Sequence, residues 1–141
     1  MLPPFDEIVS NFALLEDPTE QFEYLIELGR MLPPMAENLH TDEKLVPGCQ
    51  SKVWLDMQTS GAGADTVVNI AADSDAHITK GLVAFLVSLY SGQPARMILD
   101  KDALEMFREL GLGQHITSKR SNGLRSMVDR IRGEAARAAA A

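Results

Sequence analysis

The chain has 141 residues, of which 45% are hydrophobic and 23% are charged, and its 13 basic and 20 acidic residues give a formal net charge of −7. This length and composition suit one globular domain, so we expect a single domain over residues 1–141. The acidic balance argues against nucleic acid as a partner, because phosphate binding needs a basic surface. No stretch approaches the roughly 20 apolar residues that span a bilayer, and no signal-peptide pattern is present, so we expect a cytoplasmic protein without membrane contact.

Residues 1–34 predict two helices. Apolar residues fall at helical spacing in the first, at Phe5, Ile8, Val9 and Phe12. The second is predicted to begin at Asp17, which can cap it, with Pro18 at the first helical position and Glu20 completing a capping box. Its apolar face is expected to comprise Phe22, Leu25 and Ile26. The prolines at positions 33 and 34 should end it.

The middle of the chain predicts a β-hairpin. In SKVWLDM, the side chains of Val53, Leu55 and Met57 should point to one face and that of Trp54 to the other. The segment TVVNIAA, after the turn-rich TSGAGAD, forms the second strand. A lone hairpin is marginally stable, so we expect a third strand or helices to cover one face, and residues 35–46, otherwise irregular, are a candidate edge strand.

Helices are predicted again after residue 74. Asp75 is expected to cap a helix that ends near Gly92. Its inward residues are Ile78, Leu82, Phe85, Leu86 and Leu89. Two shorter helices follow, one opened by Pro94 and one closed by Gly111.

The last helix is expected to be capped by Thr117 or Ser118. Its predicted inward residues are Leu124, Val128 and Ile131. The tail after about residue 133 has little to bury and should fray. The whole pattern indicates the α+β class, with a small antiparallel β-sheet packed against several α-helices.

Cys49 is the single cysteine of the chain, and it follows a Pro-Gly pair in the segment LVPGCQSKVWL. A free cysteine is most often a small buried hydrophobe. Here, however, Pro47 and Gly48 predict a turn, and Gly48 lets another backbone or a substrate come close. The amides of Gln50 and Ser51 could point at a thiolate and lower its pKa. Such a thiol is able to accept a group as a mixed disulfide or persulfide and pass it on.

Other thiol chemistries fit the sequence poorly. Papain-like catalysis needs a histidine with an orienting partner, and His40, His77 and His115 lie in no recognisable protease motif. One cysteine cannot hold a zinc ion or an iron–sulfur cluster alone, so we expect no metal site. A chain with a single cysteine also has no internal disulfide and no CxxC redox motif. The absence of a disulfide fits a cytoplasmic location.

Four segments of the chain, in order, resemble the SufE/CsdE family of sulfur-acceptor proteins. They are ELGRMLPPM, VPGCQSKVWL, ADSDAHITKGLVAFLVSLYSG and HITSKRSNGLRSMVDRIR. The resemblance implies an α+β fold shared with NifU-type scaffolds. It also implies a resting state in which the cysteine loop tucks its sulfur into an apolar pocket, and swings out when a partner binds.

The resemblance further implies a function for Cys49. A cysteine desulfurase, of the SufS or CsdA kind, would pass sulfane sulfur to Cys49 as a persulfide, and the sulfur would then go to a cluster-assembly scaffold. The chain would thus be a transpersulfidation partner that stimulates the desulfurase, rather than a stand-alone enzyme. Pyridoxal phosphate would belong to the desulfurase, so no cofactor is expected here. The alternatives are a cluster scaffold of related fold and a non-covalent allosteric activator, and a homodimer is compatible with each.

Several other residues have two interpretations. Arg120 matches a family arginine near the cysteine loop, where it would favour the thiolate or contact the desulfurase; alternatively it forms a surface ion pair. Gln50 would help to hold the loop. Asp73 and Asp75 flank a turn, and helix capping by Asp75 is favoured over partner contact. Trp54 is expected to pack under a helix rather than to act as a partner hot spot, and His77 and His115 are expected to be structural.

Overall fold

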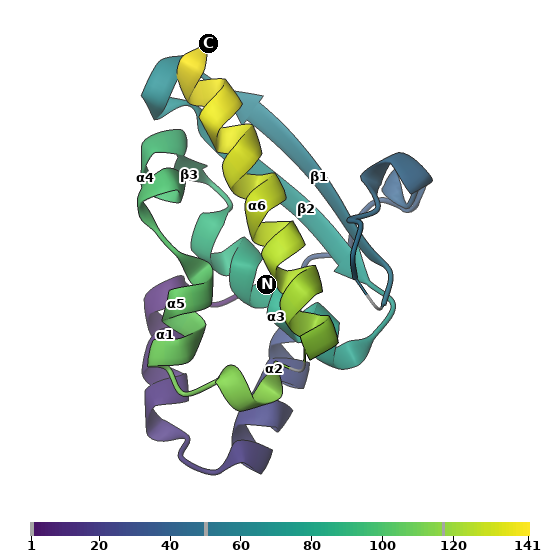
Figure 1. The fold of residues 1–141 in the computed structure, drawn as a ribbon, viewed down its shortest axis with the longest axis vertical. Helices are drawn as coiled ribbons and strands as arrows, with labels where there is room; N and C mark the ends of the chain where they lie inside the picture. The colour runs from purple at the N-terminus through teal and green to yellow at the C-terminus, as the bar shows by residue number, and fades with distance from the viewer. Residues whose placement is uncertain (1, 50, 117) are drawn as a thin grey trace.

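The computed structural model describes residues 2–49, 51–116 and 118–141 (Figure 1). The helices of these residues are α1 (Phe5–Leu14), α2 (Pro18–Met31), α3 (His77–Tyr90), α4 (Ala95–Asp100), α5 (Ala103–Glu109) and α6 (Ser118–Ala140). The strands are β1 (Val53–Ser60), β2 (Val67–Ser74) and β3 (Gln93–Pro94), which form an antiparallel sheet in the order β1-β2-β3. The fold is therefore α+β, as the sequence predicted.

Helix α2 begins after Asp17 and ends before Pro33 and Pro34, as the sequence predicted. The Asp17 carboxylate accepts a hydrogen bond of 2.8 Å from the Thr19 amide, and the helix ends at Met31 before the two prolines. The predicted apolar face is wrong for Phe22, which is 39% exposed. The buried residues of α2 are instead Gln21, Leu25, Leu28 and Gly29.

The buried face of α2 is set by a close crossing with α3. A Cβ atom at Gly81 would lie 2.1 Å from the carbonyl oxygen of Leu25, and one at Gly29 would lie 2.9 Å from the Gly81 amide nitrogen. Two glycines thus let the backbones of α2 and α3 touch. This contact turns the Leu25 and Gly29 side of α2 inward and leaves Phe22 at the edge.

The inner face of the sheet follows the predicted alternation. Val53 pairs with Ser74, Leu55 with Ala72 and Met57 with Ile70. Of these, Val53 and Leu55 are buried, and Met57 is partly buried against the core. Helix α3 packs against β2 and α6 lies alongside β1 and β2, so these helices cover this face (Figure 1).

The outer face of the sheet is covered in part by the segment before Cys49. This segment forms two short 3₁₀ turns, Glu37–Leu39 and Asp42–Lys44. As an edge strand it contributes one isolated bridge among the described residues, between Leu45 and Trp54. The third strand is β3, which pairs with the start of β2.

Polar side chains hold the start of α3. The residue before the helix is Ala76, which has no side-chain cap, so the prediction that Asp75 caps α3 is wrong. The Asp75 carboxylate instead accepts a hydrogen bond of 3.0 Å from the amide of Lys52. The helix starts one residue later than expected, and this allows Asp75 to reach the segment that follows Cys49.

The C-terminal helices are as predicted in number and place, but α6 is longer. Asp102 caps α5 with bonds to the amides of Leu104 and Glu105, and α6 continues to Ala140. The prediction that the tail has little to bury is wrong for Ala135, which is fully buried; its fraying stays a prediction. The predicted cap of α6 falls partly on Thr117, outside the described residues. No helix in the described ranges is long and apolar enough to cross a bilayer.

Candidate functional site

Cys49 lies in the loop between the segment covering the sheet and β1. The loop is anchored at both ends, because the Val46 amide donates to the Val53 carbonyl at 2.9 Å and the Lys52 amide donates to Asp75. Between these anchors Gly48 has a φ of +84°, in the left-handed region that favours glycine. The predicted Pro-Gly turn is thus present, and it directs Cys49 toward α6.

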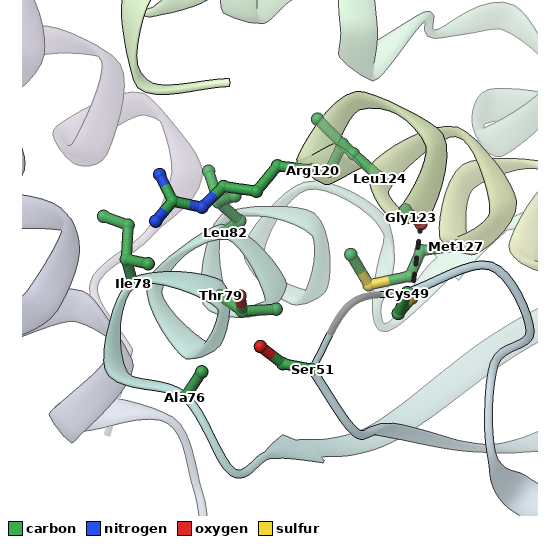
Figure 2. Close-up of a pocket in the computed structure, with 10 residues that line it drawn as sticks. All are labelled: Cys49, Ser51, Ala76, Ile78, Thr79, Leu82, Arg120, Gly123, Leu124 and Met127. Atoms are coloured by element: carbon green, nitrogen blue, oxygen red, sulfur yellow. Dashed lines mark hydrogen bonds between the residues drawn. The ribbon is translucent and has the colours of Figure 1, made fainter. Parts of the chain in front are cut away.

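The thiol of Cys49 packs against the backbone of α6. Its sulfur lies 3.7 Å from the carbonyl oxygen of Gly123, to which the S–H group donates (Figure 2). A Cβ atom at Gly123 would lie 3.0 Å from the sulfur and 3.1 Å from the Cα atom of Cys49. The loop and the helix therefore meet at a point where only glycine leaves room for the cysteine.

A pocket of about 230 Å³ opens beside the sulfur (Figure 2). It lies between the cysteine loop, the start of α3 and the first turns of α6. Its lining residues are Cys49, Ser51, Ala76, Ile78, Thr79, Leu82, Arg120, Gly123, Leu124 and Met127. The lining combines aliphatic side chains with the polar side chains of Ser51, Thr79 and Arg120, and the pocket is partly open to solvent. Cys49 itself is half-buried and packs against the core, which is the sheltered position that the resemblance implied.

The electrostatics of the site concern the protonation of the Cys49 thiol. Burial raises the pKa of the Cys49 thiol, because an apolar environment disfavours the charged thiolate. The hypothesis that the amides of Gln50 and Ser51 lower this pKa stays a prediction, because Gln50 lies outside the described residues. The half-buried position of the thiol favours its neutral form over the thiolate.

Arg120 lines the pocket at the end away from the sulfur. Figure 2 shows its side chain reaching toward Ile78. Its guanidinium donates a hydrogen bond of 3.1 Å to the carbonyl oxygen of His115, and the side chain is half-buried rather than exposed as expected. Arg120 is not among the causes of the Cys49 pKa shift.

The other predicted residues lie at various distances from this site. Gly48 sits in the turn, where a Cβ atom would lie 3.1 Å from the Ser126 hydroxyl. Gln50 lies outside the described residues. His115 is buried and its Nε2 lies 3.1 Å from the Gln21 side-chain oxygen, whereas His77 is exposed at the start of α3.

A charged cluster links the segment before the cysteine loop to the sheet. His40 lies 2.7 Å from the Asp73 carboxylate, which also contacts Lys80 at 3.2 Å. The His40 ring meets Trp54 edge-on, with the ring centroids 4.8 Å apart, so Trp54 packs under this histidine and not under a helix. The bond to Asp73 raises the pKa of His40. Burial would raise the pKa of Asp73, but its bonds to His40, the Ser74 amide and Lys80 lower it overall.

Four residues that line the pocket were missed by sequence reasoning. They are Ala76, Thr79, Gly123 and Met127. The signal for Gly123 was present, since a glycine in the interior of a helix usually has a packing reason. The partner that it packs against lies 74 positions earlier in the chain, however, and the sequence does not reveal it.

The site offers no metal centre within the part of the chain that the structure describes. No group of three or more His, Cys, Asp or Glu side chains is arranged to hold an ion there. What the geometry offers is one half-buried thiol, on an anchored loop, beside a small pocket. Such an arrangement suits covalent exchange at sulfur better than hydrolysis, which needs a base next to the nucleophile.

The chain matches known proteins over most of its length. A model of the SufE family, described as Fe-S metabolism associated domain, matches residues 6–135. A protein of Rhizobium etli, named as an uncharacterized SufE-like protein, is 48% identical over 136 residues, which are 96% of this chain and 92% of that protein. A second, from Rhizobium meliloti, is 44% identical over 130 residues, or 92% of this chain and 93% of that one.

One solved structure supports the fold alone. The solution structure of a hypothetical protein from Thermus thermophilus superposes with a TM-score of 0.76. It covers 100% of both chains at 19% sequence identity. Two sequences this different share the arrangement of helices and sheet described above.

Proposed function

This chain belongs to the SufE family of Fe-S metabolism associated domains, and on that premise we propose that it carries sulfur on Cys49. A cysteine desulfurase would transfer sulfane sulfur to Cys49 as a persulfide. The chain would stimulate the desulfurase by unloading it, and would pass the sulfur on for iron–sulfur cluster assembly. Pyridoxal phosphate has its place in the desulfurase in this scheme.

The proposed step is a thiol–persulfide exchange that needs no added oxidant. The Cys49 sulfur attacks the terminal sulfur of the persulfide on the desulfurase cysteine. A new S–S bond forms at Cys49, and the S–S bond on the desulfurase breaks. The desulfurase cysteine leaves as a thiolate and takes up the proton that Cys49 loses, so atoms, electrons and protons balance.

The observation that carries this proposal is the pocket beside the single thiol. A persulfide adds one sulfur at about 2.05 Å from the first, and about 230 Å³ of space lies next to Cys49. The aliphatic side chains of Ile78, Leu82 and Leu124 would shield part of the bound sulfur from solvent. Because the chain has one cysteine, no second thiol within it can convert the persulfide to a disulfide.

Two alternatives are weighed against this proposal. A cluster scaffold needs about three or more protein ligands for each cluster, and the described residues hold no such group. A non-covalent activator would use the same surface of the chain without placing sulfur on Cys49. That alternative is separated from the sulfur carrier by a variant that lacks only the sulfur.

The test is the turnover of a cognate cysteine desulfurase in the presence of wild type or Cys49→Ser. Serine keeps the size of the side chain close to that of cysteine but cannot hold a persulfide. If Cys49 carries sulfur, wild type should stimulate turnover and Cys49→Ser should not, although the variant still binds the desulfurase. Equal stimulation by both chains would favour the non-covalent activator.

A further inference from the structure

Gly123 is the residue of α6 against which Cys49 packs. Besides the sulfur and Cα atom of Cys49, the Cβ atom of that residue would lie 3.4 Å from a side chain at position 123. All three distances are to atoms of Cys49, so Cys49 packs against the space that a side chain at position 123 would need. Its carbonyl oxygen in turn accepts the S–H bond of the thiol.

The helix itself gives no reason for a glycine at this position. Glycine in the interior of a helix is less favourable than alanine, because it has more freedom to lose on folding. Gly133 lies on the same helix, and a Cβ atom there would have one neighbour within 4 Å, the end of the flexible Arg137 side chain at 3.9 Å. The crowding at Gly123 is therefore specific to the cysteine loop.

We infer that Gly123 is a positioning residue, whose missing side chain forms the seat that holds the Cys49 thiol closed against α6. The contact favours the neutral thiol, because its S–H group donates to the Gly123 carbonyl. A thiolate has no proton to donate and would face the negative end of the carbonyl dipole. The seat therefore holds the Cys49 loop against α6 until the thiol ionises or a partner moves the loop away.

The bearing of this seat on sulfur transfer rests on the proposed function, but the seat itself is testable without a desulfurase. In Gly123→Ala the new methyl group would lie only 3.0 Å from the sulfur and 3.1 Å from the Cα atom of Cys49, so the loop must shift away from α6. The thiol should then be less buried, and its pKa should fall. A fall of about half a pH unit corresponds to about threefold more thiolate at neutral pH, and the thiolate is the form that reacts.

The experiment is the rate of alkylation of Cys49 by iodoacetamide between pH 6 and pH 10, with purified full-length chains. Wild type and Gly133→Ala should share one pH midpoint, since the latter leaves the seat intact. Gly123→Ala should react at least about threefold faster at neutral pH and have a lower midpoint. Melting followed by circular dichroism should show that all three chains fold, because alanine favours both helix positions.

Each outcome decides the matter. A midpoint and rate in Gly123→Ala equal to those of Gly133→Ala would overturn the seat, and so would loss of the folded state in Gly123→Ala, which would make Gly123 a core residue instead. Persulfide loading is read separately, by mass. A wild type that fails to load with sulfur would contradict the proposed function while leaving the seat in place.

Discussion

At the scale of single residues, Cys49 and Arg120 divide the tasks of the site in a way that their types alone do not suggest. Burial raises the pKa of the Cys49 thiol, so the closed loop stores the sulfur in its less reactive form. Arg120 lines the far end of the same pocket and bonds to the His115 carbonyl. Under the proposed function, its charge would meet a partner or a bound sulfur species at that end of the pocket.

This division predicts the effect of Arg120→Ala. The pH midpoint of Cys49 alkylation should be unchanged, whereas stimulation of the desulfurase should fall because a positive contact at the pocket is lost. Loss of the bond to His115 should lower the free energy of unfolding by about 1 kcal/mol. Arg120→Lys is the matched control: it keeps the charge without the guanidinium fork and should stimulate to an intermediate degree. A shifted alkylation midpoint in Arg120→Ala would instead make this arginine an activator of the thiolate.

The pair of His40 and Asp73 makes stability depend on pH. The pKa of His40 is raised in the folded chain above its ordinary value of 6.5, so the folded state binds the proton more tightly. The stabilisation is fully present below about pH 6.5 and is lost as the pH rises through the raised value. At the acid end it is lost again when Asp73, whose pKa is lowered from 3.8, takes up a proton.

Urea unfolding of wild type and His40→Gln tests this dependence. The difference between their midpoints should be largest near pH 5.5 and should shrink as the pH rises above about 6.5 and His40 loses its proton. His77→Gln is a suitable control, since His77 is exposed and its loss should leave the unfolding midpoint close to that of wild type at every pH. A difference for His40→Gln that stays constant across this range would mean that the charge on His40 does not stabilise the fold.

At the scale of elements, the crossing of α2 and α3 holds the N-terminal helices to the core. A methyl group at Gly81 would overlap the Leu25 carbonyl, and backbone cannot move aside as a flexible side chain can. Gly81→Ala should therefore destabilise the chain by about 3 kcal/mol or more. Gly133→Ala, in open surroundings, should stabilise it by about 0.5 kcal/mol. Chemical unfolding of the two variants provides the comparison, and a neutral Gly81→Ala would show that the two helices are free to separate.

The elements also show what the sequence could and could not predict. Helix limits followed from local signals, such as Asp17 and the prolines after α2, because caps and breakers act within a few residues. The buried faces of the helices were less predictable. Phe22 points outward because Gly29 and Gly81 allow the opposite side of α2 to pack closely against α3. Asp75 was assigned to the wrong partner because the amide that it accepts from lies 23 positions away.

At the scale of the whole molecule, the family and the identity of the thiol followed from the sequence, but the surroundings of the thiol did not. The walls of the pocket come from three separate parts of the chain, the loop at Cys49, the start of α3 and the first turns of α6. The link between His40 and Asp73 likewise joins positions 33 residues apart. Contacts of this kind are fixed by tertiary packing, which no local pattern encodes.

The same assembly explains why one thiol suffices. The cysteine loop lies between two hydrogen-bonded anchors, at Val46 and Lys52. Release of the thiol needs a change in a few backbone torsions rather than movement of a helix or strand, and short loops of this kind open readily. Under the proposed function, a bound sulfur would lie in the pocket until a partner engages the loop.

The most direct test of sulfur transfer to Cys49 is the intact mass of the chain after incubation with a cognate desulfurase and free cysteine. Wild type should gain about 32 Da for each sulfur, and a reductant should remove the gain, because a persulfide exchanges with thiols. Cys49→Ser, treated in the same way, should gain nothing. A wild type without added mass, or a Cys49→Ser chain that acquires the same reducible mass, would contradict the assignment of sulfur transfer to Cys49.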